Sequence, residues 1–386
     1  MIKNIGITAW GAVSALGTDR EAVVRAYQQQ ESYLQQNKST GDWEGALSNP
    51  PLPTGALYQR GRFAEQIDRS VLLALLAADQ LKEELVQRDG LVTGINIGSS
   101  RGATGLWEQH FAQFTNEGTG KLSPLASPTT TLGNISSWLG AYLNIEGPAI
   151  SHSVTCSTAL QAIANGVAWL ESGRCQRFLA GGSEAPLTPF TLAQMKALRI
   201  YADPEPAAYP CRSFDPEIHN NSMVLGEGAA LYLLEANAVR PLAWIRGIGF
   251  AQEIPTTPTS VSARGDAITR AMRQALSEYG EDQVDVVICH APGTRLGDAA
   301  ERYAIDTVLG KQMPFLTGNK WKLGHTLGAS GALSLEMALL MLQRQEIYSI
   351  PFLPVTESRV RSVSSVMVNA MGFGGNAISL ILEVCK

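Results

Sequence analysis

Short apolar runs alternate with longer amphipathic stretches along the first part of the chain. Where apolar residues follow one another without helical spacing we expect buried strands, at residues 2–10, 93–100, 147–154 and 177–185. Where they recur every three or four positions we expect helices, from near Thr18, over 68–85 with Asp68 as N-cap, and over 156–173. The glycine-rich stretch after the first strand is expected to be a loop. This alternation predicts βαβ units and a mainly parallel sheet.

The same order of elements returns in the last third of the chain. Strands are expected at 241–250, 284–294 and 374–384, and helices at 266–280 and 297–310. No low-complexity linker separates the two rounds, so the halves are expected to pack against each other. The pattern therefore predicts an α/β protein with two related halves, residues 1–240 and 241–386.

Composition and charge narrow the class of protein. The chain of 386 residues is 45% hydrophobic and 17% charged, which allows a large globular core. Its net charge of −5 and the absence of a basic run argue against nucleic acid as a partner. We expect no signal peptide and no transmembrane helix. A patch of Arg60, Arg62 and Arg69 is a candidate for attracting an acidic carrier.

The five cysteines are odd in number and form no CxxC pair. This usage favours a reducing compartment, hence the cytoplasm, and argues against a disulfide framework or a zinc ribbon. Cys156 lies among small residues in "VTCSTALQAI", where the predicted strand meets the predicted helix. It is either a small core residue or a nucleophile whose thiolate is favoured by the helix N-terminus. From this segment alone, the structural interpretation is the commoner one.

Three further stretches favour the nucleophile. His290 follows an apolar strand, at the kind of strand end where α/β proteins build sites. His325 lies in the glycine-rich stretch "GHTLGASGA", with Lys320 five residues before it, and "GFGG" occupies 372–375. Together they supply a nucleophile, proton or hydrogen-bond partners, and backbone donors for an oxyanion. That combination is typical of acyl transfer.

These motifs resemble those of the β-ketoacyl-ACP synthases, the elongating condensing enzymes of the thiolase superfamily. The similar segments occur in family order and span essentially the whole chain: "ITAWGAVSALG", "GPAISHSVTCSTALQAI", "AGGSEAPLTP", "HAPGTRLGDAAE", "NKWKLGHTLGASGA" and "GFGGNAISLIL". The resemblance implies a thiolase-like fold, in which two pseudo-repeated βαβαβ halves form α-β-α-β-α layers.

The resemblance also implies a role for each site residue. Cys156 matches the acyl-accepting nucleophile, and His290 and His325 match the two histidines of a Cys-His-His triad. Lys320 and Glu301 match the residues that support the triad. The remaining match is Phe373, the gating phenylalanine, whose N–H joins that of Cys156 in holding the oxyanion.

The activity implied is a decarboxylative Claisen condensation of the acyl group on Cys156 with malonyl-ACP. No metal or organic cofactor is implied, because the substrates arrive on the phosphopantetheine of acyl carrier protein. The implied protein is a cytoplasmic dimer, either of identical subunits or with a paralogous ketosynthase, without membrane insertion.

Departures from the family pattern indicate a specialised synthase of a polyketide or polyene pathway. Ala291 and Pro292 follow the first histidine, the segment 214–228 is longer than usual, and Trp321 occupies a position that is commonly small.

A chain-length-determining partner subunit is the alternative, although such partners commonly lack the nucleophile. A thiolase needs a second reactive cysteine, and Cys385 lies too near the chain end; initiating synthases pair cysteine with histidine and asparagine.

Overall fold

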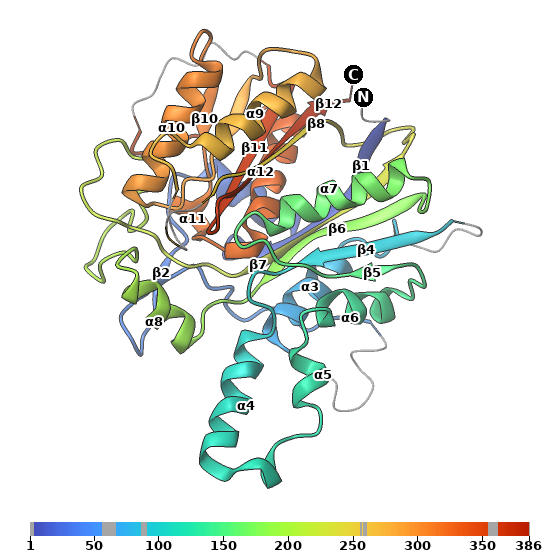
Figure 1. The fold of residues 1–386 in the computed structure, drawn as a ribbon, viewed down its shortest axis with the longest axis vertical. Coiled ribbons are helices and arrows are strands. Elements are labelled where there is room, and N and C mark those ends of the chain that lie inside the picture. The colour runs from blue at the N-terminus through green and yellow to red at the C-terminus, as the bar shows by residue number, and fades with distance from the viewer. Residues whose placement is uncertain are drawn as a thin grey trace.

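The computed structural model describes residues 4–55, 67–85, 91–254, 257, 261–353 and 362–385. Over these residues the main sheet has ten strands in the order β10-β9-β11-β12-β8-β1-β7-β6-β4-β5 (Figure 1). The first half of the chain supplies β1 (Ile5–Ser14), β4 (Thr93–Gly98), β5 (Ala149–Ile150), β6 (Arg177–Glu184) and β7 (Gly228–Ala236). The second half supplies β8 (Ala243–Gln252), β9 (Val286–Ile288), β10 (Phe315–Thr317), β11 (Ser365–Gly372) and β12 (Asn376–Val384).

The helices fall into two sets by position along the chain. The first half holds α1 (Arg20–Gln28), α3 (Arg69–Asp79), α4 (Thr104–Glu117), α5 (Ala126–Thr130), α6 (Asn134–Leu143), α7 (Thr158–Glu171) and α8 (Pro189–Ala197). The second half holds α9 (Asp266–Tyr279), α10 (Arg295–Leu309), α11 (Lys320–Leu323) and α12 (Ser330–Arg344). A two-stranded ribbon, β2 (Gln35–Gln36) with β3 (Trp43–Glu44), and the 3-10 turns η2 (Thr119–Lys121) and η3 (Leu327–Ala329) complete the description.

Helices α7 and α12 lie between the strands of the two halves and contact both sets (Figure 1). Helices α3 and α6 cover the outer face of the first half, and α9 covers that of the second, with α10 packed on α9. The hydrophobic clusters follow this arrangement, since the largest surrounds the two central helices and smaller ones lie under α3 and α9. The α/β class and the α-β-α-β-α layers expected from the sequence are confirmed.

The two halves of the sheet meet along one short joint. Ile5–Ile7 of β1 pair with Ala243–Ile245 of β8, in antiparallel register. Around this joint β7, β1, β8 and β12 all run antiparallel to their neighbours, and parallel pairing is confined to β6-β4-β5 and β11-β9-β10. The prediction of a mainly parallel sheet was therefore wrong at the centre. Strand β8 follows β7, and β12 follows β11, after short loops without a helix, and antiparallel neighbours need only such a short connection.

Several element boundaries differ from those predicted. Strand β1 continues to Ser14, through the stretch expected to be a loop, because its glycine at 11 lets α3 pack close: a Cβ there would lie 2.2 Å from the Ala77 carbonyl oxygen. Helix α3 begins after the predicted N-cap Asp68, whose carboxylate accepts the Ser70 N–H at 2.8 Å, but it ends at Asp79. Only Ala149–Ile150 of the predicted 147–154 strand is extended and paired in the sheet.

Candidate active site

A cavity of about 610 Å³ brings together four of the six residues singled out in the sequence. Cys156 lies just before α7, His290 just after β9, His325 between α11 and η3, and Phe373 between β11 and β12. The cavity therefore takes its cysteine from the first half and its two histidines from the second. Much of the remaining wall is apolar: Met195, Leu198, Ile200, Met223, Val261, Leu327 and Met371.

The thiol and the two imidazoles are in contact range of one another. The Cys156 Sγ lies 3.2 Å from the His325 Nε2, a hydrogen-bond distance for sulfur. The His290 ring stands 5.3 Å from the His325 ring, centroid to centroid, at an interplanar angle of 82°. All three side chains are buried. The arrangement presents one polarised S–H and two ring edges at the base of an apolar cavity.

The turn before α7 fixes the direction of the nucleophile. Thr155 adopts the left-handed region, with φ of 54°, so the chain bends sharply into Cys156. The Thr155 hydroxyl donates to the Phe373 carbonyl at 3.1 Å and ties this turn to the GFGG segment. Gly372 makes the approach possible, because a Cβ there would lie 1.9 Å from the Thr155 Oγ1. The backbone of residues 372–373 is thus held against the turn that carries Cys156.

His290 is positioned by Glu301 and not by its own ring contacts. The Glu301 carboxylate accepts the backbone N–H groups of His290 and Ala291, both at 2.8 Å, and the Asn369 side-chain amide at 3.1 Å. Glu301 is buried on α10 and does not line the cavity. Its contacts set the backbone from which the imidazole projects.

Pro292 does not disturb this geometry, although its position after His290 departs from the family pattern. The donors on either side of it bind buried carboxylates: Ala291 donates to Glu301, and Gly293 donates to Asp298 at 3.2 Å. The carbonyl of Gly293 accepts the Ser222 N–H at 2.8 Å from the unusually long segment 214–228. The segment 214–228 is therefore hydrogen-bonded to the residue that follows Pro292.

Lys320 lies beneath the site, buried at the start of α11. Burial lowers the pKa of its ammonium, and the nearby Glu301 carboxylate opposes that change. Its positive charge adds to burial in holding the pKa of both His290 and His325 well below the usual histidine value. Lys320 does not line the cavity, so it acts on the site through its field.

Burial raises the pKa of the Cys156 thiol to about 12, with the Glu184 carboxylate adding to the effect and Lys320 opposing it. A thiol activated by the helix start was the expectation, and the structure differs. Helix α7 begins at Thr158, two residues beyond Cys156, so desolvation of the buried sulfur outweighs the helix dipole. At rest the site holds a protonated thiol against neutral imidazoles.

Glu184 is a site residue that the sequence analysis did not single out. It ends the wholly buried strand β6. Its carboxylate accepts the hydroxyls of Ser99 and Ser100, at 2.8 and 2.7 Å, and the Gly328 N–H at 3.0 Å. It thereby joins the end of β4 to the turn that follows His325. A charged residue closing the apolar run "RFLAGGSE" is the signal that marks it in the sequence.

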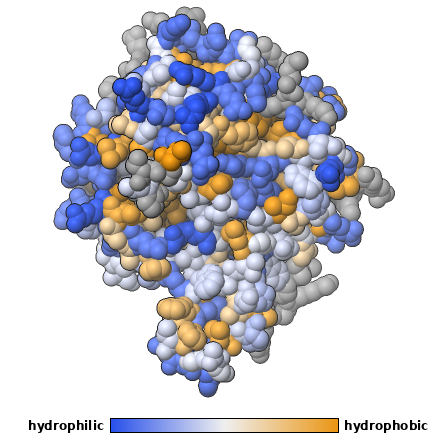
Figure 2. Space-filling model, in the orientation of Figure 1, coloured by the Kyte–Doolittle hydropathy of each residue, from blue (hydrophilic) through white to orange (hydrophobic). Residues whose placement is uncertain are grey.

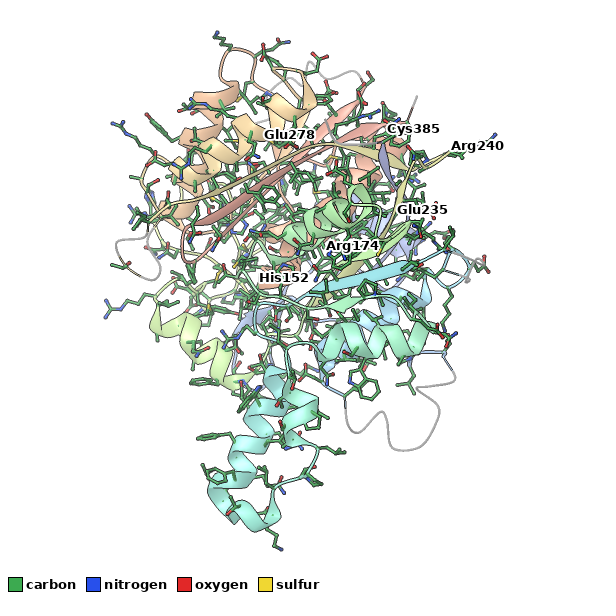
Figure 3. All side chains as sticks on the ribbon, turned by 45° about the vertical axis from the view of Figure 1, so that its right-hand side comes forward. His152, Arg174, Glu235, Arg240, Glu278 and Cys385 are labelled. Atoms are coloured by element: carbon green, nitrogen blue, oxygen red, sulfur yellow. The ribbon has the colours of Figure 1, made fainter. Side chains whose placement is uncertain are left out.

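The other candidate groups lie apart from the cavity. Arg60 and Arg62 of the predicted basic patch are outside the described residues, and Arg69 forms an ion pair with Glu227 at 2.6 Å. His152 lies between the sheet and α7, where its Nδ1 is 3.1 Å from the Asn96 amide (Figure 3). Cys385 is exposed near the chain end, on the side of the molecule that also carries Arg240 (Figure 3). No helix within the described ranges is both long and apolar enough to cross a membrane.

Comparison with known proteins agrees with this geometry. The family model described as "Beta-ketoacyl synthase, N-terminal domain" matches residues 5–239, and "Beta-ketoacyl synthase, C-terminal domain" matches residues 242–351. The chain is 26% identical over 357 residues to 3-oxoacyl-[acyl-carrier-protein] synthase 2 of Vibrio cholerae, covering 84% of this chain and 85% of that one. It is 28% identical over 365 residues to the putative polyketide beta-ketoacyl synthase 1 of Streptomyces cyaneus, covering 82% of each.

Among solved structures, the ishigamide ketosynthase/chain length factor matches the fold with a TM-score of 0.87. The match covers 100% of both chains at 21% sequence identity. It extends the likeness in fold past residue 351, where the second family model ends, and includes β11, the GFGG turn and β12.

Proposed function

The chain belongs to the β-ketoacyl synthase family, and from that membership we propose that it joins an acyl group carried on Cys156 to the two-carbon unit of malonyl-acyl carrier protein. As a member of this family it is a carbon–carbon bond-forming acyltransferase. The observation that carries the proposal is the 3.2 Å contact between the Cys156 Sγ and the His325 Nε2, at the base of a cavity that His290 also lines.

The first step is transfer of the acyl group to the enzyme. The Cys156 sulfur attacks the thioester carbonyl while the His325 Nε2 takes the thiol proton, because a thiol of pKa about 12 is not ionised beforehand. The N–H groups of Cys156 and Phe373 hold the oxyanion, and each such donor typically contributes about 3 kcal/mol. The tetrahedral intermediate expels the carrier thiolate, which takes the proton back from His325.

The second step is decarboxylation followed by carbon–carbon bond formation. Malonyl-carrier protein places its thioester oxygen against His290 and His325, whose neutral rings donate hydrogen bonds to it. Loss of carbon dioxide leaves an enolate that these donors stabilise. The enolate carbon attacks the acyl-Cys156 thioester and releases the Cys156 thiolate, which is then reprotonated. The product is a β-ketoacyl-carrier protein two carbons longer than the acyl donor.

Acyl carrier protein delivers both substrates on its phosphopantetheine arm, and the reaction needs no further cofactor. The apolar wall of the cavity suits an aliphatic or polyene chain, since its polar groups are concentrated near Cys156 and the mouth. We place the enzyme in the cytoplasm, in a type II pathway of the specialised polyketide or polyene kind. The polyketide relative and the departures at Pro292 and segment 214–228 support this choice over housekeeping fatty-acid synthesis.

A second candidate function is that of a chain-length-determining partner in a ketosynthase heterodimer. The structural match to a ketosynthase/chain length factor favours considering it. The complete set of Cys156, His290 and His325 in one cavity favours the catalytic subunit instead, because a partner that performs no condensation has no use for this set.

The deciding experiment incubates the purified chain with a panel of acyl-carrier proteins and malonyl-carrier protein, and measures intact masses of enzyme and carrier. We expect an acyl adduct on the wild type, none on Cys156→Ala, and a β-ketoacyl carrier product. Cys175→Ala is the matched control, since Cys175 is buried and remote from the cavity lining. A folded sample that forms neither adduct nor product would assign the chain to the partner role.

A further inference from the structure

Among the described residues that line the active-site cavity, Arg295 is the one that carries a permanent charge. It is exposed at the first residue of α10, whereas Cys156, His290 and His325 are buried. The charge therefore lies at the mouth of the cavity and the chemistry at its base. A cation at the mouth suits a ligand whose anionic group lies far from the atom that reacts at Cys156.

The backbone beneath Arg295 is fixed on both sides. Its N–H donates to the Asn221 Oδ1 at 3.0 Å, and the Asn221 amide donates to the Arg199 carbonyl at 2.9 Å. The preceding N–H, that of Thr294, donates to the buried Asp298 carboxylate at 3.2 Å. No carboxylate within the described ranges pairs with the Arg295 guanidinium itself. The Arg295 backbone is therefore held in place, and its guanidinium has no carboxylate partner among the described residues that would compete with an anionic ligand.

We infer that Arg295 binds the phosphate of the phosphopantetheine arm while the arm's thioester lies at Cys156. This inference rests on the proposed function, because that function supplies the arm as the substrate's carrier. His290 and Arg295 are five positions apart, so their backbones are at most about 18 Å from each other, a distance that an extended pantetheine chain bridges. The guanidinium fork matches two phosphate oxygens, and no other described lining residue would neutralise the phosphodiester charge.

The test compares two ligands that differ only in the phosphate: 4′-phosphopantetheine and pantetheine. Ligand-observed NMR titration of the whole protein should show wild type binding the phosphorylated arm about tenfold more tightly. Arg295→Gln should remove this preference and leave pantetheine binding unchanged, and Arg295→Lys should keep part of it. Arg273→Gln is the control, since Arg273 is an exposed arginine of α9 that does not line this cavity.

The rate of acyl transfer to Cys156 tests the proposed function separately from the binding of the phosphate. Acyl-pantetheine should acylate Cys156 in Arg295→Gln at the wild-type rate, whereas the rate with acyl-phosphopantetheine should fall about tenfold. An equal loss with both donors would assign Arg295 a structural role, and a preference that survives Arg295→Gln would place the phosphate elsewhere; either result overturns the inference. If the wild type prefers the phosphorylated arm yet forms no adduct, the inference stands and the proposed catalysis fails.

Discussion

A neutral pair of groups, thiol and imidazole, defines the site at rest. Burial raises the pKa of Cys156 to about 12, and burial together with the charge of Lys320 lowers the pKa of both histidines. The ion pair found in many cysteine nucleophiles is therefore disfavoured here. In the proposed reaction deprotonation accompanies attack on the thioester, so we expect the first step to depend on the 3.2 Å contact with His325.

His325 is expected to serve both steps, and His290 only the second. His325→Ala should slow acyl transfer to Cys156 by about 10² to 10⁴-fold, the usual contribution of a general base, because the thiol loses its acceptor. His290→Ala should acylate at near the wild-type rate and fail to release carbon dioxide. Single-turnover mass measurements and carbon dioxide release distinguish the steps. Wild-type acylation by His325→Ala would contradict this division of roles.

Glu301 is expected to act through the backbone of His290. Glu301→Gln replaces one acceptor oxygen by an amide that faces a backbone N–H, so unfolding free energy should fall by about 3 kcal/mol. Decarboxylation should fall more than acylation, since His290 is displaced and His325 is not. Denaturant titration and the two step-specific assays check this. Asp306→Asn, on the exposed side of α10, is the control. It should change neither the free energy of unfolding nor the rates of the two steps.

At the scale of elements, hydrophobic pattern and local motifs predicted most helices and strands that flank the site. Helices α7, α9 and α10 and strands β4, β6, β8 and β12 are close to their predicted ranges. Strands β7 and β11 were not predicted, because each is buried on both faces, and periodicity does not distinguish such an apolar run from a buried helix segment. Both strands run antiparallel to a neighbouring strand, β7 to β1 and β11 to β12, and this is the part of the sheet where the parallel prediction was wrong.

For the site, the sequence indicated which residues matter but not what their surroundings do to them. The lowered pKa of His325 and the raised pKa of Cys156 depend on burial, which is a property of the packed cavity. Glu184 was missed for a similar reason: the donors to its carboxylate come from segments distant along the chain. The charge that closes the apolar run of β6 marks Glu184 in the sequence, but it does not indicate which distant groups the carboxylate binds.

The end of β11 should tolerate no side chain at Gly372. Gly372→Ala would force a Cβ to within 1.9 Å of the Thr155 Oγ1, so the turn that carries Cys156 must shift. A displacement of about 1 Å typically costs on the order of a hundredfold in rate, and we expect that loss in acylation. Gly120→Ala is the matched control, because a Cβ there meets no atom within 4 Å. An unimpaired Gly372→Ala enzyme would contradict the assigned contact.

The middle of α12 carries a buried acid, Glu336, that should make stability depend on pH. Burial raises its pKa to about 8, while its contact with the Tyr27 hydroxyl, at 3.5 Å, opposes the change. Between the usual glutamate pKa, near 4.3, and pH 8, the unfolded chain has lost a proton that the folded chain keeps. This contribution to stability is therefore full at low pH and is lost as the pH rises through that window.

Glu336→Gln should remove this dependence, since the amide has no proton to lose. Relative to wild type, the variant should gain in denaturant midpoint between pH 5.5 and pH 8. Glu117→Gln, an exposed change on α4, provides the comparison and should follow the wild-type curve. Parallel curves for wild type and Glu336→Gln would show that the acid does not titrate across this range.

At the scale of the whole molecule, α4 and α5 form a lobe that projects from the body (Figure 1). Figure 2 shows apolar residues gathered on this lobe. Trp107 and Phe111 of α4 are 57% and 62% exposed, and Phe114 and Leu125 are also exposed. A lone globular protein seldom exposes such a cluster. We expect a second ketosynthase protomer, identical or paralogous, to cover it.

Charge on the lobe should weaken that association. Trp107→Glu together with Phe111→Glu should lower the dimer fraction measured by native mass spectrometry, with the protomer still folded, because an interface core excludes charge. Val239→Glu, at an exposed apolar residue in the connection between the two halves, should leave the dimer fraction unchanged. A double variant that dimerises like the wild type would move the interface to another face.

The short joint between β1 and β8 also sets an order of events during synthesis. A ribosome releases Cys156 before His290, His325 and the GFGG turn have been translated. Until the second half docks across Ile5–Ile7, the nascent thiol has neither proton acceptor nor oxyanion donors in place. A chain that ends before the second half therefore lacks the groups that the proposed acyl transfer needs. The seam that holds the halves together is thereby also where the site is completed.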